Sequence, residues 1–470
     1  MARLKNGNKI TRVLISLACL MVVVSPAIIY LYYITAFGFD IPFSDTWREI
    51  PFIKQYLTGK LQFLTLFTVY GPYKSVTDIL TTLLIVKLFH WNTRIYSFIG
   101  FGYQVITGYI LYKVYWQQSK QIRNQYIRIL GCFPIFLCLF SLRQWEASFG
   151  QWSPVFFGGI FFPILAFYAL DKMELRWFTI AVLSGIFGSL TFITGVLVWP
   201  IGLLQLLYVM KNKGPNESRK FILVPLVWGV FGVASSIIYL LGISAPSSSA
   251  KSLSNLMQIV QRFFITLGIT LSADKGVISL QPKWTDATVD VRVSIIVGVF
   301  ILLVLIVGSV LSWKKNANVF GLKLAIILFG LISVGMTAIG RTELGLQQAI
   351  ASRYTAYSSI VVVGAYLVIV EASLLGKEYS HWAGLAAKEL LRAIIVIILF
   401  SSVVATVTEL YLGPYRKEFF MNWANTVRNY SSVSDDKFSV DPMISSGLTP
   451  QDLREYSHFL EEYQLSLFRK

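Results

Sequence analysis

Three carboxylates in one short segment are the first side chains of this 470-residue sequence that could do chemistry. They follow a long apolar stretch, so they should emerge together at the end of a membrane helix. The three residues are Asp40, Asp45 and Glu49. A carboxylate can remove the proton of an attacking hydroxyl group. The alternative is a solvated loop in which Asp45 caps a helix that begins at Thr46.

A second polar segment, residues 141–152, lies between two apolar stretches and is rich in aromatic residues. Its Trp side chains could pack against the apolar faces of sugar rings, although Trp is also enriched at membrane interfaces. With Trp47 of the first segment, the candidate binding residues here are Arg143, Gln144, Trp145 and Glu146.

A third segment, residues 340–355, places two arginines and an acid near the ends of predicted helices. Arginine binds phosphate oxygens in a forked geometry, and ionisable groups at this depth are costly and often functional. The alternative is that these arginines reach lipid head groups. The candidates are Arg341, Glu343, Arg353 and Tyr354.

The predicted topology puts all three segments on the outer side of the membrane. Together they hold carboxylates, aromatic surfaces and arginines. This set could transfer a sugar from a lipid-phosphate donor to a hydroxyl acceptor, since arginine stabilises the departing phosphate and a carboxylate deprotonates the acceptor. The location of all three segments on the same side of the membrane supports this hypothesis more strongly than any one segment does.

The composition is that of a membrane protein. Apolar residues make up 55% of the chain, charged residues only 14%, and the mean hydropathy is +0.63. These values exclude a disordered chain, a coiled coil and an ordinary soluble enzyme. The net charge of +17 could indicate nucleic acid, but stretches such as residues 221–250 carry no charge at all. We therefore expect the chain to contact membrane lipids and not to bind nucleic acid.

We predict an all-α polytopic protein with about eleven transmembrane helices, because a bilayer core requires about 20 apolar residues in helical form. The predicted spans are 13–37, 95–116, 127–142, 154–170, 177–194, 196–210, 221–243, 291–313, 320–340, 354–374 and 391–411. Residues 177–210 could instead form one long tilted helix, which would invert everything after it. If residues 177–210 form a hairpin, most basic residues lie on the cytoplasmic side together with the N-terminus. This distribution is typical of membrane proteins and favours the hairpin over one long helix.

Three outer segments are too long to be simple connections. The first, about residues 38–94, contains amphipathic stretches at Thr46–Tyr56 and Ser75–Phe89 that suit the membrane interface. The second, about 244–292, contains an amphipathic stretch at Leu256–Leu271, interfacial or re-entrant. The third is an extracytoplasmic tail, 412–470, which follows the membrane domain 1–411. Thr449 and Pro450 predict the start of a short helix over about 450–464.

The sequence indicates no certain cofactor and no metal site. Three cysteines lie in apolar stretches, three histidines are scattered, and no Cys-x-x-Cys occurs. A divalent cation is left open, because Asp45 and Glu49 alone do not make a site.

Short motifs over most of the chain resemble those of bacterial polytopic GT-C-type glycosyltransferases. They include Pro42-x-x-Asp45-x-Trp47, Ser141-x-x-Gln144-Trp145-Glu146-x-x-x-Gly150, Gly195-x-Leu197-x-Trp199-Pro200, and Gly340-Arg341 with Ser352-Arg353-Tyr354. Gly59-x-Leu61 and the final Leu465-Ser466-Leu467-Phe468 are similar too.

This resemblance implies a catalytic carboxylate soon after the first helix, which would be Asp45 with Asp40 as second choice. It implies a polyprenyl-phosphate-linked sugar as donor and an extracytoplasmic glycan as acceptor, such as the O-antigen of lipopolysaccharide or another surface polysaccharide. The implied location is the bacterial inner membrane. The chain departs from the family at residues 70–75, which lack the His- and Glu-containing patch that members often carry.

Two other functions remain open at this point. A transporter or lipid-linked-sugar flippase would carry ionisable groups near mid-membrane, or related halves with broken helices, and would move its substrate unchanged. A non-catalytic polysaccharide-assembly protein would bind a stable partner and would not depend on the aspartates.

Overall fold

Apolar helices make up nearly all of the described chain. The computed structural model describes residues 9–68, 75–212, 222–241, 253–272, 289–313, 317–340, 346–375, 381–438 and 447–469. The long helices are α1 (Lys9–Phe37), α4 (Arg94–Gln118), α8 (Trp152–Leu170), α9 (Leu175–Thr191), α10 (Val198–Asn212), α12 (Val224–Leu240), α14 (Val291–Trp313), α15 (Ala317–Gly340), α16 (Thr355–Leu374) and α17 (His381–Arg428). No β-strand occurs within these ranges.

The helices are those of an integral membrane protein, as the composition predicted. Eight helical stretches are long and apolar enough to cross a bilayer: 10–37, 125–148, 152–170, 193–212, 291–312, 321–340, 352–374 and 381–428. Each lies at a predicted span. The other three predicted ranges, 95–116, 177–194 and 221–243, also form helices, which are shorter or less apolar. The count of eleven crossings stays a prediction.

Residues 177–210 form two helices rather than one, so the predicted hairpin is confirmed. Helix α9 ends at Thr191, and a 3-10 turn over Ile193–Leu197 leads into α10. The turn folds back on α9, because a Cβ on Gly195 would lie 1.9 Å from the carbonyl oxygen of Gly188. Trp199 at the start of α10 then donates to Ser189 Oγ of α9, at 2.8 Å.

The predicted span at 127–142 is broken into two short helices, α5 (Gln125–Leu130) and α6 (Phe133–Leu139). Pro134 is the second residue of α6, where the missing amide hydrogen of proline is tolerated. A side chain on Gly131 would lie 1.9 Å from the Tyr115 hydroxyl. The hydroxyl of Tyr366 donates to the freed carbonyl oxygen of Gly131, at 2.6 Å.

The first outer segment forms a helical cap, with a 3-10 helix (Ser44–Glu49), α2 (Ile50–Leu57), a 3-10 helix (Phe63–Phe67) and α3 (Val76–Phe89). Helix α3 turns its polar face inward. Asp78 and Thr82 are buried, whereas Leu80, Leu84 and Leu88 are about half exposed. This orientation suits a helix whose outer face contacts lipid.

Helix α13 (Leu253–Gly268) does not simply lie on the membrane surface. It begins exposed at Leu256 and ends buried at Leu267. Its last residue, Gly268, packs directly against Ser294 of α14. A Cβ on Gly268 would lie 1.9 Å from the carbonyl oxygen of Ser294. Ser358 of α16 donates to the carbonyl oxygen of Leu267, at 2.6 Å. The end of α13 is therefore inserted among the membrane helices.

The predicted tail begins inside a helix, because α17 continues without a break from His381 to Arg428, past residue 411. Pro414 lies inside this helix, yet the helix persists past it. The short helix predicted at 450–464 is confirmed as α20 (Pro450–Glu462), which Thr449 caps together with Asp452. The tail packs on the first outer segment, where the Ser466 amide donates to the carbonyl oxygen of His90, at 3.0 Å.

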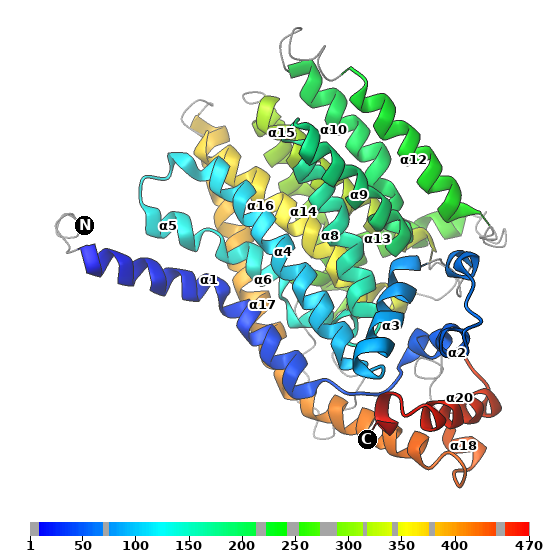
Figure 1. Cartoon of the computed structure of the whole chain (residues 1–470). Helices are drawn as coiled ribbons and strands as arrows, with labels where there is room; N and C mark the ends of the chain where they lie inside the picture. Colours follow the sequence, from blue (N-terminus) through cyan, green and yellow to red (C-terminus); the bar gives the residue numbers. More distant parts are fainter. Residues whose placement is uncertain are drawn as a thin grey trace.

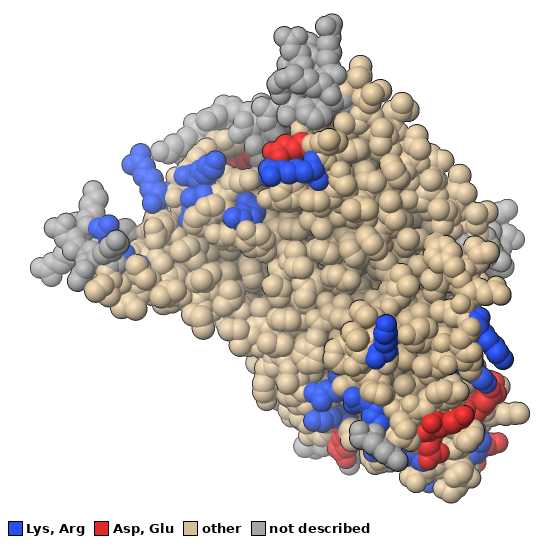
Figure 2. Space-filling model, viewed as in Figure 1, with Lys and Arg blue, Asp and Glu red and all other residues tan. Residues whose placement is uncertain are grey.

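Charged side chains gather at two ends of the molecule. Helices α2, α3, α18 (Asp435–Phe438) and α20 lie together at the end away from the N-terminus (Figure 1). Figure 2 shows basic side chains on the N-terminal side and mixed acidic and basic side chains at the α20 end. A broad band between them carries few charges on this face. Such a band is what a lipid-embedded region requires.

Candidate functional site

Three segments that are far apart in the sequence meet at the N-terminal end of α8. The Phe43 and Trp152 rings lie edge to face, 5.1 Å apart. The backbone amide of Glu146 donates to Ser352 Oγ, at 3.0 Å. Arg341 and Glu343 lie outside the described residues, so the site is built from the remaining candidates.

Asp45 is the most accessible of the candidate carboxylates that the structure describes. Its side chain is 24% exposed, compared with 16% for Asp40 and 7% for Glu146. It lies in the first turn of a 3-10 helix whose N-cap is Phe43, so it is not the helix cap that the alternative reading expected. Its carboxylate oxygen is 3.8 Å from Arg48 Nε. An acid in this position can contact a substrate.

Asp40 holds the chain together rather than facing a substrate. One oxygen accepts hydrogen bonds from the amide and hydroxyl of Thr93, at 2.8 and 3.1 Å. The other oxygen pairs with Arg469 of the tail. Asp40 therefore connects the end of α1 with the start of α4 and the C-terminal segment.

Glu49 and Asp78 form a buried carboxyl pair behind Asp45. Glu49 Oε2 accepts a hydrogen bond from the Tyr96 hydroxyl, at 2.7 Å, and Asp78 Oδ2 accepts one from Gln151. The second oxygen of each acid is buried and has no donor among the described residues. The two side chains interact directly with each other. One proton shared between the two free oxygens would satisfy both acids.

Burial raises the pKa of Asp78 to about 7, and the nearby charge of Asp45 acts in the same direction. Burial also raises the pKa of Glu49 well above its usual range, and the charge of Asp78 adds to this effect. The pair therefore keeps at least one proton at neutral pH, and it binds more protons in the folded state than in the unfolded state.

Stability should consequently fall as the pH rises from about 4, where the carboxyl group of the unfolded chain ionises, to about 7, the pKa of Asp78 in the folded protein. Within this window each pH unit should cost up to about 1.4 kcal/mol per extra bound proton. In Asp78→Asn, an amide replaces the shared proton, so this loss between about pH 4 and pH 7 should largely disappear. Thermal midpoints in detergent measure it, with Glu455→Gln, an exposed acid on α20, as control. Equal pH profiles for wild type and Asp78→Asn would refute the shared proton.

Glu146 fixes Arg353 against two aromatic rings. Its Oε1 lies 3.2 Å from Arg353 Nη1, and its Oε2 accepts hydrogen bonds from Ser352 Oγ and the Arg353 amide, both at 3.0 Å. The guanidinium carbon of Arg353 lies 4.7 Å from the centre of the Trp152 ring and 5.1 Å from that of Tyr354. The charge of Asp45 also acts on Arg353. Glu146 and the two rings thus hold a positive group within range of the charge of Asp45.

The other candidates are buried and support the site. Gln144 donates to the carbonyl oxygen of Leu139, at 2.6 Å. Trp145 packs under the guanidinium of Arg416, whose central carbon lies 4.1 Å from the ring centre. The remaining two, Arg143 and Trp47, are 3% and 0% exposed. Of the candidates around α8 that the structure describes, Asp45 and Arg353 combine charge with partial exposure, at 24% and 12% of the side chain.

Two features escaped the sequence analysis. Asp78 was placed only within an amphipathic stretch, although it is the one acid in an apolar 14-residue helix. That contrast was a usable signal. The second feature is the buried ion pair between Arg416 and Glu409, which are seven residues apart on α17. Arg416 also donates a hydrogen bond to the Tyr33 hydroxyl of α1, at 3.1 Å.

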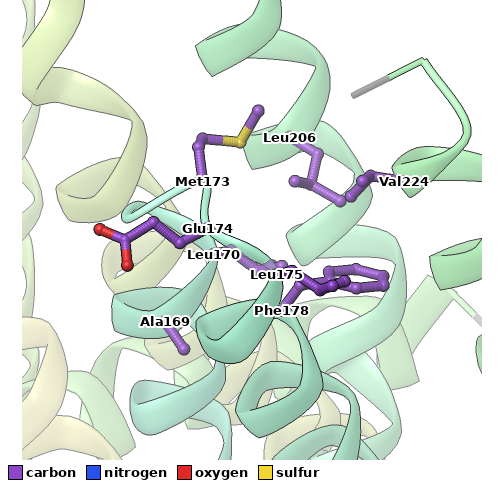
Figure 3. A pocket seen from close by; sticks show the side chains of 8 residues that line it. All are labelled: Ala169, Leu170, Met173, Glu174, Leu175, Phe178, Leu206 and Val224. Atoms are coloured by element: carbon purple, nitrogen blue, oxygen red, sulfur yellow. The ribbon is translucent and has the colours of Figure 1, made fainter. Parts of the chain in front are cut away.

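The large apolar pocket in Figure 3 lies far from this cluster. It has a volume of about 250 Å³ and opens at the turn between α8 and α9. Glu174 is the only carboxylate among its lining residues, and it pairs with Arg176 at 2.7 Å. The 19 residues of α8 separate the pocket from Trp152 by roughly 28 Å, at 1.5 Å per residue. We therefore assign the pocket no part in the chemistry of the carboxylates.

The described residues contain no group of three or more His, Cys, Asp or Glu side chains that could hold a metal ion. No family model matches this sequence, and no curated protein is significantly similar to it.

Proposed function

We propose that this protein is a membrane glycosyltransferase of the GT-C type. It would transfer a sugar from a polyprenyl-phosphate donor to a glycan outside the cytoplasm, such as O-antigen or another surface polysaccharide. The observation that carries the proposal is the position of Asp45. This accessible carboxylate lies close enough to Arg353 for their charges to interact, and Arg353 is itself held between Glu146 and Trp152.

In the proposed reaction, the oxygen of the acceptor hydroxyl forms a bond to the anomeric carbon of the sugar, and Asp45 accepts the proton of that hydroxyl. The bond between that carbon and the donor phosphate breaks, and its electron pair stays on the phosphate oxygen. Arg353 stabilises this developing charge. The products are the glycosylated acceptor and polyprenyl phosphate.

The burial of the other acids supports Asp45 as the base. Both oxygens of Asp40 are engaged by Thr93 and Arg469. Glu49 is 1% exposed and shares its environment with Asp78. Of the two candidate arginines that the structure describes, Arg353 suits the donor phosphate better, since Arg143 is deeply buried. Arg341 remains a further candidate.

The proposal includes eleven membrane crossings, a cytoplasmic N-terminus and the bacterial inner membrane. The distribution of basic residues supports this orientation. Positive side chains flank α1 at its start and follow α4, as in Arg12 and Lys120, whereas acids accumulate in the tail. Cytoplasmic loops carry an excess of Lys and Arg in membrane proteins.

Mass analysis of surface polysaccharide and lipid-linked sugars, with and without the gene, tests the proposed function. Loss of the gene should remove a sugar from the polysaccharide and cause the lipid-linked donor to accumulate. The wild-type gene should restore the sugar, and Asp45→Asn should not. Unchanged glycans and donor in the deletion strain would contradict the proposal.

One observation favours a transporter as the second candidate. Lys323 of α15 and Glu371 of α16 form an ion pair, with 0% and 8% of their side chains exposed. Buried ion pairs in membrane helices often lie on transport pathways. Glu371 is, however, only three residues from the end of α16. In proteoliposomes, a transporter would move the lipid-linked sugar across the bilayer without changing its mass.

A further inference from the structure

A polar hollow with an excess of positive charge lies beside Asp40, apart from the carboxylates near α8. Its volume is about 330 Å³, and it is formed by the end of α1, the start of α4, the outer part of α17 and the C-terminal segment. Four cations line it, and we call it the basic hollow. They are Arg94, Lys417, Arg428 and Arg469.

The four positive charges meet only one carboxylate among the lining residues, that of Asp40. Asp40 is already engaged, because it pairs with Arg469 and accepts two hydrogen bonds from Thr93. The other three cations donate to neutral groups. Such contacts orient the cations without cancelling their charge, so the hollow retains a positive field.

The neutral partners of Arg94 and Lys417 lie at the end of a membrane helix. Arg94 Nη2 donates to the carbonyl oxygen of Thr35 and Lys417 Nζ to that of Ala36, both at 2.9 Å. These carbonyls belong to the last turn of α1, where no intrahelical donor is available. Capping explains why these two cations sit here. It leaves their charges unbalanced, and the Nε of Arg94 is buried without a partner among the described residues.

Capping of α1 does not explain the other two cations. Arg428 Nη2 lies 3.4 Å from the carbonyl oxygen of Leu467, and Arg469 Nε donates to that of Ser466, at 3.1 Å. Lys417 and Arg428 are eleven residues apart on α17, about three helical turns, so both face the same side of the helix. Positive groups from α4, α17 and the C-terminal segment thus converge on one space.

We propose that the basic hollow binds a phosphate group at the membrane surface. The hollow begins at Gly38, directly after the last residue of the membrane-length helix α1, which is the depth at which lipid head groups lie. Arginine and lysine donors form charge-assisted hydrogen bonds to phosphate oxygens. Either a lipid head group or free phosphate supplies this chemistry. The inference does not depend on the proposed sugar transfer.

Thermal unfolding of the purified full-length protein in an uncharged detergent tests this site. The two probes are short-chain phosphatidylglycerol and inorganic phosphate, each compared with potassium chloride at matched ionic strength. We expect at least one probe to raise the unfolding midpoint by about 3–5 °C at saturation. A shift with phosphatidylglycerol alone identifies a lipid head group, whereas a shift with inorganic phosphate as well identifies the free anion as sufficient.

The double variant Lys417→Gln, Arg428→Gln should weaken binding of the effective probe about tenfold or more, because each charge-assisted hydrogen bond to phosphate is lost. Both residues are exposed, so the fold should tolerate the change. Arg428→Lys should retain most of the binding. Arg392→Gln is the matched control, since Arg392 lies exposed on the same helix and pairs with Glu389.

Three results would overturn the proposal. They are no shift with either probe, an equal shift with chloride, or equal binding by wild type and the double variant.

Discussion

Asp45→Asn should lower the rate of sugar transfer by about 10²–10⁴-fold, the usual contribution of a general base. The amide has the same shape but cannot accept the acceptor's proton. The side chain is 24% exposed, and its Oδ1 lies 3.8 Å from Arg48 Nε. The substitution should therefore lower the stability of the fold only slightly. The measurement is transfer of labelled sugar from a polyprenyl-phosphate donor by purified protein.

Asp40→Asn is the matched comparison for this prediction. Its carboxylate accepts hydrogen bonds from Thr93 and pairs with Arg469. We therefore expect a lower thermal midpoint with a much smaller loss of rate in the protein that remains folded. If Asp45→Asn were fully active while Asp40→Asn lost activity without losing stability, the roles assigned to the two acids would be wrong.

Glu146→Ala should be among the most destabilising single substitutions in the cluster. It leaves Arg353 buried without its carboxylate, and breaking a buried ion pair costs about 3–5 kcal/mol. It also removes the acceptor of the Ser352 hydroxyl and the Arg353 amide. Chemical or thermal unfolding in detergent measures the loss, and the protein that stays folded should transfer sugar poorly because Arg353 is no longer positioned.

Glu174→Ala provides the control for Glu146→Ala. Its ion pair with Arg176 is exposed, with 51% and 76% of the side chains accessible, and exposed pairs contribute about 0–1 kcal/mol. The double variant Glu146→Leu, Arg353→Met should be more stable than Glu146→Ala, since it leaves no unpaired charge. Equal losses for Glu146→Ala and Glu174→Ala would show that the buried pair does not hold this site together.

The helices of the fold were largely predictable from the sequence. Long uncharged stretches have only one stable form in lipid, so helices at the predicted spans follow from backbone hydrogen bonding. The turn at 192–197 was predictable too, because the placement of basic residues favoured a hairpin. The break at Gly131 was not, since it depends on Tyr115 and Tyr366 from other helices.

The sequence predicted which segments contribute residues to the site, but it did not predict which side chains contact each other. The motifs marked Asp45, Glu146 and Arg353 because acids and arginines stand out in an apolar chain. The ion pair between Glu146 and Arg353 joins residues 207 positions apart, and no local pattern encodes it. Asp78 was missed because α3 reverses the usual rule: its leucines face outward and its acid faces inward, as lipid surroundings allow.

The end of α17 shows a contact that the sequence did not predict. The helix continues past the predicted span at 391–411 into the predicted tail and ends at Arg428. In the structure, Arg416 is buried against Glu409 and Trp145, so its charge is compensated inside the helix bundle. Glu409 lies seven residues earlier on the same helix, whereas Trp145 is far away in the sequence, so its contact with Arg416 appears only in three dimensions.

The proposed function requires the end of the molecule that carries Asp45 to face away from the cytoplasm. Single cysteines can be introduced at the exposed positions Lys60, in the first outer segment, and Lys120, beyond α4. The three buried native cysteines are replaced by alanine in this background. In intact spheroplasts, a membrane-impermeant maleimide should label the cysteine at position 60 and should reach position 120 only after lysis. Labelling of position 120 alone in intact spheroplasts, or of both positions equally, would contradict the account.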